Sequence, residues 1–185
     1  MELNRETALS LLNEYTKNPA LIKHMLAVEA ALAAYAKKFN EDENLWRIIG
    51  ILHDFDYEQN PDLKDHTNKG AEILRERGVS EEIIHTIRSH NDYNKIPRET
   101  LLEKTLYAVD ELCGFTVAVA LVRPSKAIAD VQVKSVKKKL KDKAFARQVN
   151  REEIRHGAEQ LGVELDEHIQ TVLDAMKGIS AELGL

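Results

Sequence analysis

At residues 51–54 the sequence reads Ile51-Leu52-His53-Asp54, an apolar pair followed at once by an imidazole and a carboxylate. We expect these residues to end a helix of about residues 43–54, because Trp46, Ile49 and Leu52 recur at helical spacing. Adjacent residues on a helix point about 100° apart, so His53 and Asp54 can share one ligand only where the helix ends. Imidazole and carboxylate are ligands of divalent transition metals. The stretch therefore predicts metal ligands at the end of a core helix.

The rest of the chain has the pattern of a helical protein. Only 8 Gly and 4 Pro interrupt the 185 residues, and apolar residues recur mostly at spacings of three and four, so we expect an all-α fold. The stretch 115–120 is rich in β-branched residues but has no partner strand, and we expect it to be helical as well. The other predicted helices cover about residues 4–17, a stretch beginning at Pro19, 66–77, 80–90, a stretch beginning after Pro97, a lysine-rich stretch after Pro124, a stretch beginning at Asn150, and 164–183.

Composition and charge exclude several classes of protein. A net charge of -5 argues against a dedicated binder of nucleic acid or of a membrane surface, so we expect neither partner. Cys113 is the single cysteine, which rules out an intrachain disulfide and fits a reducing compartment. Residues 1–6 mix acids and bases, unlike a signal peptide, and the longest apolar run, residues 117–122, is too short for a membrane span. We therefore expect a cytoplasmic protein.

Two further polar residues stand out in apolar helices. His24 lies within Leu21–Leu26, and Asp110 lies within Tyr107–Leu112. A carboxylate in such surroundings is costly to desolvate unless it is paired or bound to a metal. Both residues are therefore candidate partners for the pair at residues 53 and 54.

The ordered set of His24, His53-Asp54 and Asp110 resembles the HD superfamily of metal-dependent phosphohydrolases, over roughly residues 20–115. The resemblance implies a helical HD-domain bundle in which these four residues bind a first metal. Residues 1–185 are then expected to form one domain, with an HD core of about 20–115 and C-terminal helices of about 125–185. The expected cofactor is one or two divalent ions of iron, manganese, cobalt, nickel or zinc per chain.

The middle of the chain resembles the members of this superfamily that hold two metals. In those proteins, histidines equivalent to His66 and His90 bind a second ion and the Asp of the dipeptide bridges the two, which assigns that role to Asp54. The chain departs from the cyclic-dinucleotide phosphodiesterase branch. It has Asn91 where that branch has a second His, and it lacks that branch's Gly-Tyr-Pro signature. A cyclic-di-GMP substrate is therefore not implied.

The resemblance implies hydrolysis of a small phosphorylated molecule, a nucleotide or a related phosphoester, as phosphomonoesterase or phosphodiesterase. A metal-activated hydroxide would attack phosphorus, because a bound divalent ion lowers the pKa of its water. Nearby cations should stabilise the charge that develops on the phosphoryl oxygens. We expect His53, Asp54 and Lys69 to be catalytic, and we expect three cations to bind the substrate, namely Arg88, Arg123 and Lys137.

The segment 134–147 carries seven cations and one acid, a local charge of +6 that leaves -11 for the rest of the chain. Val133, Val136 and Leu140 give it an apolar stripe, so its lysines should form the outer face of an amphipathic helix. That face is either simply solvated or a cationic flap that draws the substrate over the metals. His156 and His168 lie in charged helices outside the resemblance, and we expect both to be solvated.

Two alternatives to an enzyme stay open. One is a non-catalytic ligand-binding or regulatory HD module with a structural metal. The other is RNA binding through the lysine-rich helix, which the net acidity disfavours. The sequence does not determine the substrate, the metal or the oligomeric state.

Overall fold

The computed structural model describes residues 3–185, and every regular element in that range is a helix. Residues 1–2 lie outside the described residues. They belong to the stretch 1–6 from which we expect no signal peptide. None of the described helices is both long and apolar enough to cross a membrane. The α-helices are α1 (Arg5–Tyr15), α2 (Pro19–Phe39), α3 (Glu43–Leu52), α4 (Asn68–Glu76), α5 (Glu81–Ser89), α6 (Leu101–Leu121), α7 (Val133–Lys141), α8 (Arg151–Leu161), α9 (Leu165–Gly178) and α10 (Ser180–Leu183), with 3₁₀ turns η1 (Asp92–Asn94) and η2 (Ile128–Asp130).

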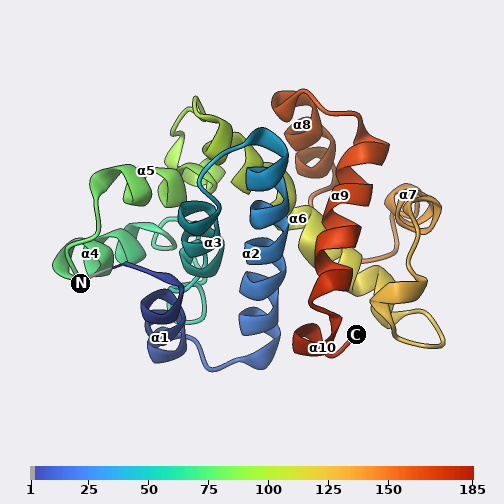
Figure 1. The fold of residues 1–185 in the computed structure, drawn as a ribbon, viewed down its shortest axis with the longest axis horizontal. Coiled ribbons are helices and arrows are strands. Elements are labelled where there is room, and N and C mark those ends of the chain that lie inside the picture. The colour runs from blue at the N-terminus through green and yellow to red at the C-terminus, as the bar shows by residue number, and fades with distance from the viewer. Residues whose placement is uncertain (1–2) are drawn as a thin grey trace.

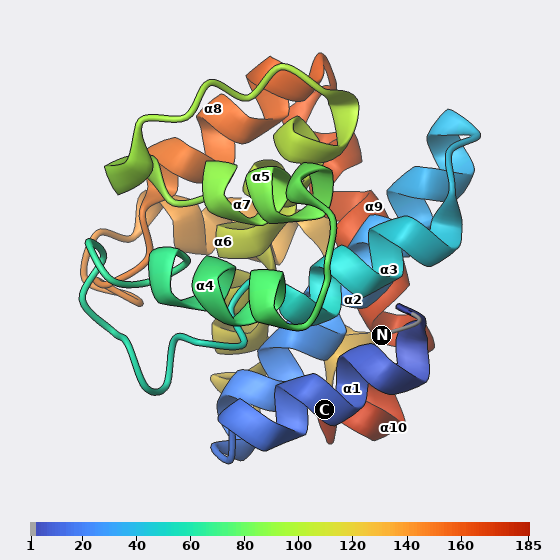
Figure 2. The ribbon, with the colours of Figure 1, turned by 90° about the vertical axis from the view of Figure 1, so that its left-hand side faces the viewer.

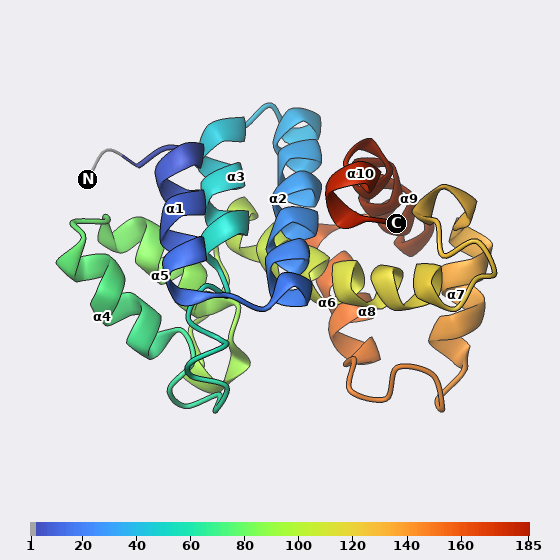
Figure 3. The same ribbon diagram turned by 90° about the horizontal axis from the view of Figure 1, so that it is seen from below.

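Helix α2 is the centre of the molecule. It packs against α3 on one side, against α9 on the other and against α6 behind (Figure 1). Helices α4 and α5 lie side by side at one end of this core (Figure 2). Seen from below, α7–α10 form the opposite end, and α2 and α6 lie between the two groups (Figure 3). Helix α5 contacts α6, and the C-terminal helices contact both α2 and α6. These two longest helices also carry His24 and Asp110.

Side-chain caps fix where the helices of the core begin. Asn18 accepts a hydrogen bond from the Ala20 N–H and precedes Pro19 at the first helical position of α2. Thr100 and Glu103 form a capping box at the start of α6, which runs unbroken through residues 115–120 as expected. These caps satisfy backbone N–H groups in the first turns of the helices that carry His24 and Asp110.

Two helix boundaries differ from those expected. His66 does not open a helix, because Thr67 adopts a left-handed conformation (φ 62°) and α4 begins only at Asn68. The helix expected over residues 164–183 is two helices, since α9 ends at Gly178 and Ile179 leaves helical geometry before α10 begins. Glycine is a poor helix former, which explains the break.

The C-terminal helices pack directly on the backbone of α6. Gly157 of α8 lies so close that a Cβ atom there would be 2.6 Å from the Ala108 Cα. His168 of α9 is fully buried, which corrects the expectation that it is solvated, whereas His156 is more than half exposed. Nε2 of His168 donates to the Ala108 carbonyl (2.9 Å), and Nδ1 accepts from the Tyr35 hydroxyl (2.6 Å). One imidazole thus ties α9 to both α2 and α6.

Candidate metal centre

Three helices bring together the four residues expected to bind a first metal. Nε2 of His24, from α2, lies 2.9 Å from Oδ1 of Asp110 on α6. His53 follows the last residue of α3, and its Nε2 lies 3.5 Å from the same Asp110 oxygen. Oδ2 of Asp54 lies 3.7 Å from the His53 Nε2 and 4.0 Å from the His24 Nε2. The four side chains therefore face a single point.

Asp54 also takes part in a second group, with His66 and His90. Its Oδ1 lies 3.1 Å from Nε2 of His66 and 3.1 Å from Nε2 of His90. The donor atoms of this trio, like those of His24, His53 and Asp54, all lie within 4.8 Å of one another. One carboxylate oxygen thus faces each group, which is the arrangement of a bridging carboxylate.

Hydrogen bonds on the far side of the rings determine which nitrogen faces inward. Nδ1 of His53 donates to the Gly50 carbonyl (2.8 Å), and Nδ1 of His90 donates to the Ile87 carbonyl (2.6 Å). A carbonyl only accepts, so in each neutral ring Nδ1 carries the proton and Nε2 presents a lone pair to the centre. Such anchoring through the second nitrogen is the usual arrangement for metal-binding histidines.

Two observations show that these residues fit a divalent cation, a buried ring nitrogen without a partner and a close pair of ring nitrogens. Nε2 of His53 is buried and has no hydrogen-bond partner among residues 3–185. Nε2 of His66 and Nε2 of His90 face each other at 3.4 Å, so two lone pairs oppose each other in the neutral rings unless a cation lies between them. A buried polar atom without a partner is costly. Imidazole and carboxylate together suit the later first-row transition metals.

The loop after α3 holds His66 in place through Asp56. This buried carboxylate accepts from Nδ1 of His66 (3.0 Å) and from the backbone N–H groups of Thr67 and Gly70 (both 2.9 Å). A side chain at residue 70 would bring its Cβ within 2.9 Å of the Asp56 Cγ, so this approach requires glycine. Asn91 donates to the His66 carbonyl and supports the same loop.

The carboxylates raise the pKa of two of the histidines. Burial alone would lower the pKa of His53, but the charge of Asp54 and the contact with Asp110 outweigh it and raise the pKa to about 9. Burial is likewise outweighed at His66, mainly by Asp54, and its pKa rises to about 10. Burial would raise the pKa of Asp54, yet its histidine neighbours hold that pKa well below its usual range. A cation is therefore favoured here, and a metal must compete with protons for the imidazoles.

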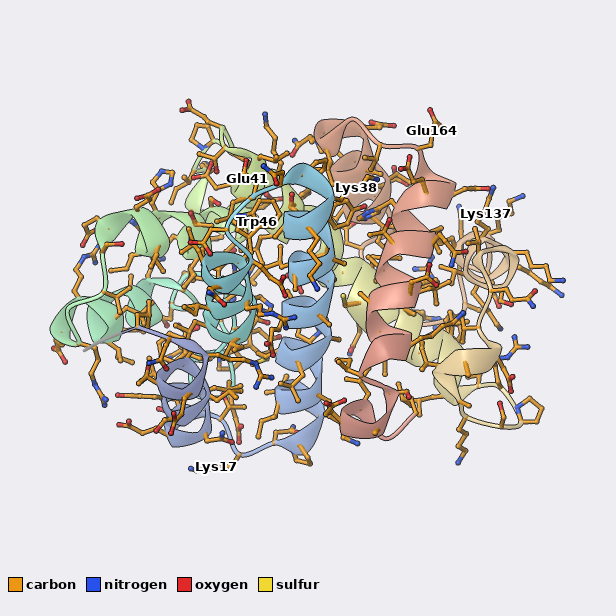
Figure 4. All side chains as sticks on the ribbon, viewed as in Figure 1. Lys17, Lys38, Glu41, Trp46, Lys137 and Glu164 are labelled. Carbon is orange, nitrogen blue, oxygen red and sulfur yellow. The ribbon has the colours of Figure 1, made fainter. Side chains whose placement is uncertain are left out.

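The centre opens into a hollow of about 500 Å³ lined by His24, Asp54, His66, His90 and Asp110 together with residues of the loop after α3, η1 and α8. The four cations expected to assist catalysis or bind substrate do not line it. Lys69 pairs with Glu72, Arg88 contacts Asn68, Arg123 contacts Ser135, and Lys137 pairs with Asp166. Figure 4 shows Lys137 on α7, at the opposite side of the molecule from α4 and α5.

Several residues that line the hollow were not expected from the sequence. Glu111 and Glu153 contribute carboxyl groups, and burial followed by the charge of Asp110 raises the pKa of Glu111 to about 8. A second acid directly after Asp110 in an apolar helix is a signal that could have singled out Glu111. Gln148 and Glu153 lie far along the chain, and only the packing of α8 on α6 places them at the hollow.

Comparison with known proteins identifies the family. A model of the HD domain matches residues 21–114, about half of the chain, and the chain belongs to the HD-domain family. The match includes His24, His53, Asp54, His66, His90 and Asp110.

Two curated relatives are similar to about half of the chain. The chain is 32% identical over 87 residues to a tRNA (cytidine(56)-2'-O)-methyltransferase of Thermoplasma volcanium, which covers 47% of this chain and 25% of that protein. It is 27% identical over 95 residues to a Ribonuclease Y of Oleidesulfovibrio alaskensis, which covers 51% of this chain and 18% of that protein. The similarity thus spans a quarter or less of each relative's length. No solved structure gives a significant match.

Proposed function

We propose that the protein is a metal-dependent phosphohydrolase that acts on a small phosphorylated molecule, a nucleotide or a related phosphoester. The observation that carries the proposal is the position of Asp54. One of its oxygens faces His24 and His53, and the other faces His66 and His90. A bridging carboxylate between two sets of histidines suits a pair of divalent ions, and such pairs favour displacement at phosphorus.

His24, His53, Asp54 and Asp110 would hold the first ion, and Asp54, His66 and His90 the second. When bound, such ions polarise phosphoryl oxygens and lower the pKa of water. The residues of the chain provide the rest. The Gly50 and Ile87 carbonyls and Asp56 orient the imidazoles, and the hollow gives substrate access to the exposed side of the centre.

The hollow also bears on the non-catalytic alternative. A purely structural metal needs no open face, whereas His24, Asp54 and Asp110 all line a hollow large enough for a small organic molecule. Both curated relatives act on RNA according to their names, so a short RNA oligonucleotide belongs among the substrates to be screened.

Metal content and hydrolysis of phosphoesters test the proposal together. The protein is loaded separately with iron, manganese, cobalt, nickel and zinc and is assayed on nucleotides, other phosphoesters and an RNA oligonucleotide. Asp54→Asn should lose most of the bound metal and all detectable hydrolysis, because it removes the shared carboxylate. Asp62→Asn is the matched control, since the Asp62 side chain is 61% exposed in the loop after α3. Full metal content in Asp54→Asn would contradict the site, and a metal-loaded wild type without any hydrolysis would favour a binding module.

The number of ions is tested by His66→Ala combined with His90→Ala. This double variant should keep one ion per chain and lose most of the activity, since the first group stays intact. Unchanged stoichiometry and rate would show that these two histidines are not ligands.

A further inference from the structure

One wall of the hollow comes from a part of the chain that the family match does not include. The match ends at residue 114, but Gln148, Asn150 and Glu153 line the hollow together with the candidate metal ligands. Seen from below, the segment between α7 and α8 and the loop after α3 lie along the same edge of the molecule (Figure 3). The C-terminal helices therefore take part in forming the site.

The position of this wall is fixed by close packing. Gly157 brings α8 into backbone contact with Ala108. Gly157 lies about two turns after Asn150, the N-cap of α8, and Ala108 lies two residues before Asp110 on α6. At the start of α8, the Asn150 side chain accepts from the Glu152 and Glu153 N–H groups and donates to the Glu153 carboxylate. Asn150 and Glu153 thus form one unit held at a set distance from the metal ligands.

The lining is acidic and contains no lysine or arginine in the described part of the chain. Its acids are Asp54, Asp92, Asp110, Glu111 and Glu153. Asp92 is paired with Arg98, which lies outside the lining. Metal ions would offset the charge of Asp54 and Asp110 and could hold one phosphate there. A further phosphate on the same substrate would approach Glu153, with no lysine or arginine in the described lining to balance the two negative charges, and like charges brought together cost free energy.

The remaining groups suit an uncharged, polar organic moiety. The amide of Gln148 makes no hydrogen bond to any of residues 3–185, so it is free both to donate and to accept. Tyr93 also lines the hollow and is 57% exposed, an aromatic face on which a planar ring can stack. The volume of about 500 Å³ is in the range of sites for molecules of nucleoside size.

We propose that the wall of Gln148, Asn150 and Glu153 determines substrate specificity, so that the hollow takes a monoester with one phosphate on an uncharged, planar and polar group and discriminates against di- and triphosphates. The inference rests on the proposed function, because the metals hold the phosphate. Gln148 and Glu153 contact the organic moiety, and Asn150 positions Glu153.

Binding and turnover of three probes test this on the manganese-loaded protein. Calorimetry gives the affinities for adenosine 5′-monophosphate, adenosine 5′-diphosphate and inorganic phosphate, and kcat/KM is measured for the two nucleotides. The monophosphate should bind at least about tenfold more tightly than either of the other probes. Equal or tighter binding of the diphosphate, or equal binding of inorganic phosphate, would overturn the inference.

A charge reversal on the wall provides the sharper test. Glu153→Lys should shift the ratio of the two nucleotide affinities toward the diphosphate by at least about tenfold. Glu152→Lys is the matched control, because Glu152 is adjacent, lies in the same first turn and has an 82% exposed side chain. Equal shifts in both variants would show a general effect of charge and overturn the proposal. Glu153→Gln should shift the ratio in the same direction and tests the idea even if the lysine variant fails to fold.

The outcomes separate this inference from the proposed function. The protein could bind the monophosphate more tightly, with the affinity ratio changed only by substitution of Glu153, and yet hydrolyse none of the probes. That result would contradict the proposed enzymatic function and support the role of the wall in specificity. A protein that hydrolyses mono- and diphosphates equally keeps the enzymatic proposal and loses the assignment.

Discussion

Lowering the pH should weaken the fold through His168. Both of its ring nitrogens are used in the neutral state, one as donor to Ala108 and one as acceptor from Tyr35. Burial, followed by the charge of Lys38, lowers its pKa to about 4 despite the hydrogen bond from the ring to the Ala108 carbonyl. An unfolded histidine has a pKa of about 6.5. The unfolded chain therefore binds the proton more readily than the folded chain throughout the interval between these values.

The magnitude follows from linkage between protonation and folding. Because the folded pKa of His168 is depressed to about 4, its contribution to stability is complete above the unfolded value and is lost as the pH falls toward the folded one. A shift of about 2.5 units corresponds to a limit of about 3 kcal/mol, and between pH 7 and pH 5 the loss is about 2 kcal/mol. That is a substantial part of the stability of a typical domain.

The assay is urea unfolding at pH 7 and pH 5 of the metal-free wild type and of His168→Gln. The variant loses the titrating group, so its free energy of unfolding should fall by about 2 kcal/mol less than that of the wild type over this interval. Taking the difference between the two proteins removes the contributions of all other titrating groups that the substitution leaves unchanged. His156→Gln, at an exposed site, should behave as the wild type does. Parallel pH profiles for wild type and His168→Gln would refute the reasoning.

Three more outcomes are expected. Gly157→Ala should lower the free energy of unfolding by roughly 1–3 kcal/mol in the same urea assay, because the new Cβ meets the Ala108 backbone. Gly114→Ala should raise it by about 1 kcal/mol, because nothing lies within 4 Å of the new Cβ and alanine is the better helix former. Asp56→Asn should reduce metal affinity about 10- to 100-fold in a competition titration, since it weakens the support of His66, and unchanged affinity would contradict that role. Removing the metal with EDTA should lower the melting temperature, because an ion at 100 times its Kd stabilises the fold by about 2.7 kcal/mol, and an unaltered melting curve would show that no ion is bound.

Local pattern was enough to predict most of the helices, and the resemblance to the HD superfamily completed the set of residues that meet at the centre. The caps at residues 18 and 150 are local signals, and they lie where the structure begins α2 and α8. His24 and Asp110 could be singled out because each is a polar group in an apolar stretch, and they are 86 residues apart yet in contact. The all-α fold and the family were therefore predictable from the sequence.

What failed was reasoning from proximity along the chain. Lys69 and Arg88 are near ligand-bearing segments in sequence, but the helices on which they lie point them to other partners. His168 lies among Glu164, Asp166 and Glu167, which suggested a solvated face. Its spacing from the buried residues Ile169 and Val172 places it on the inner face of α9 instead. Helical periodicity therefore predicts that His168 is buried, although its neighbours in sequence are charged.

The contact of α8 and α9 with Ala108 shows that the family match and the packed core of this protein end at different points of the chain. The HD-domain match stops at residue 114, inside α6 and before the helices that cover its far side. A fragment cut there would expose the apolar residues of α2 and α6 that these helices bury, and would remove the hydrogen bond from His168 to the Ala108 carbonyl. The helices beyond residue 114 thus cover part of the core formed by the matched region. If residues 21–114 are moved into another protein, other residues must bury the apolar surface of α2 and α6 that α8 and α9 bury here.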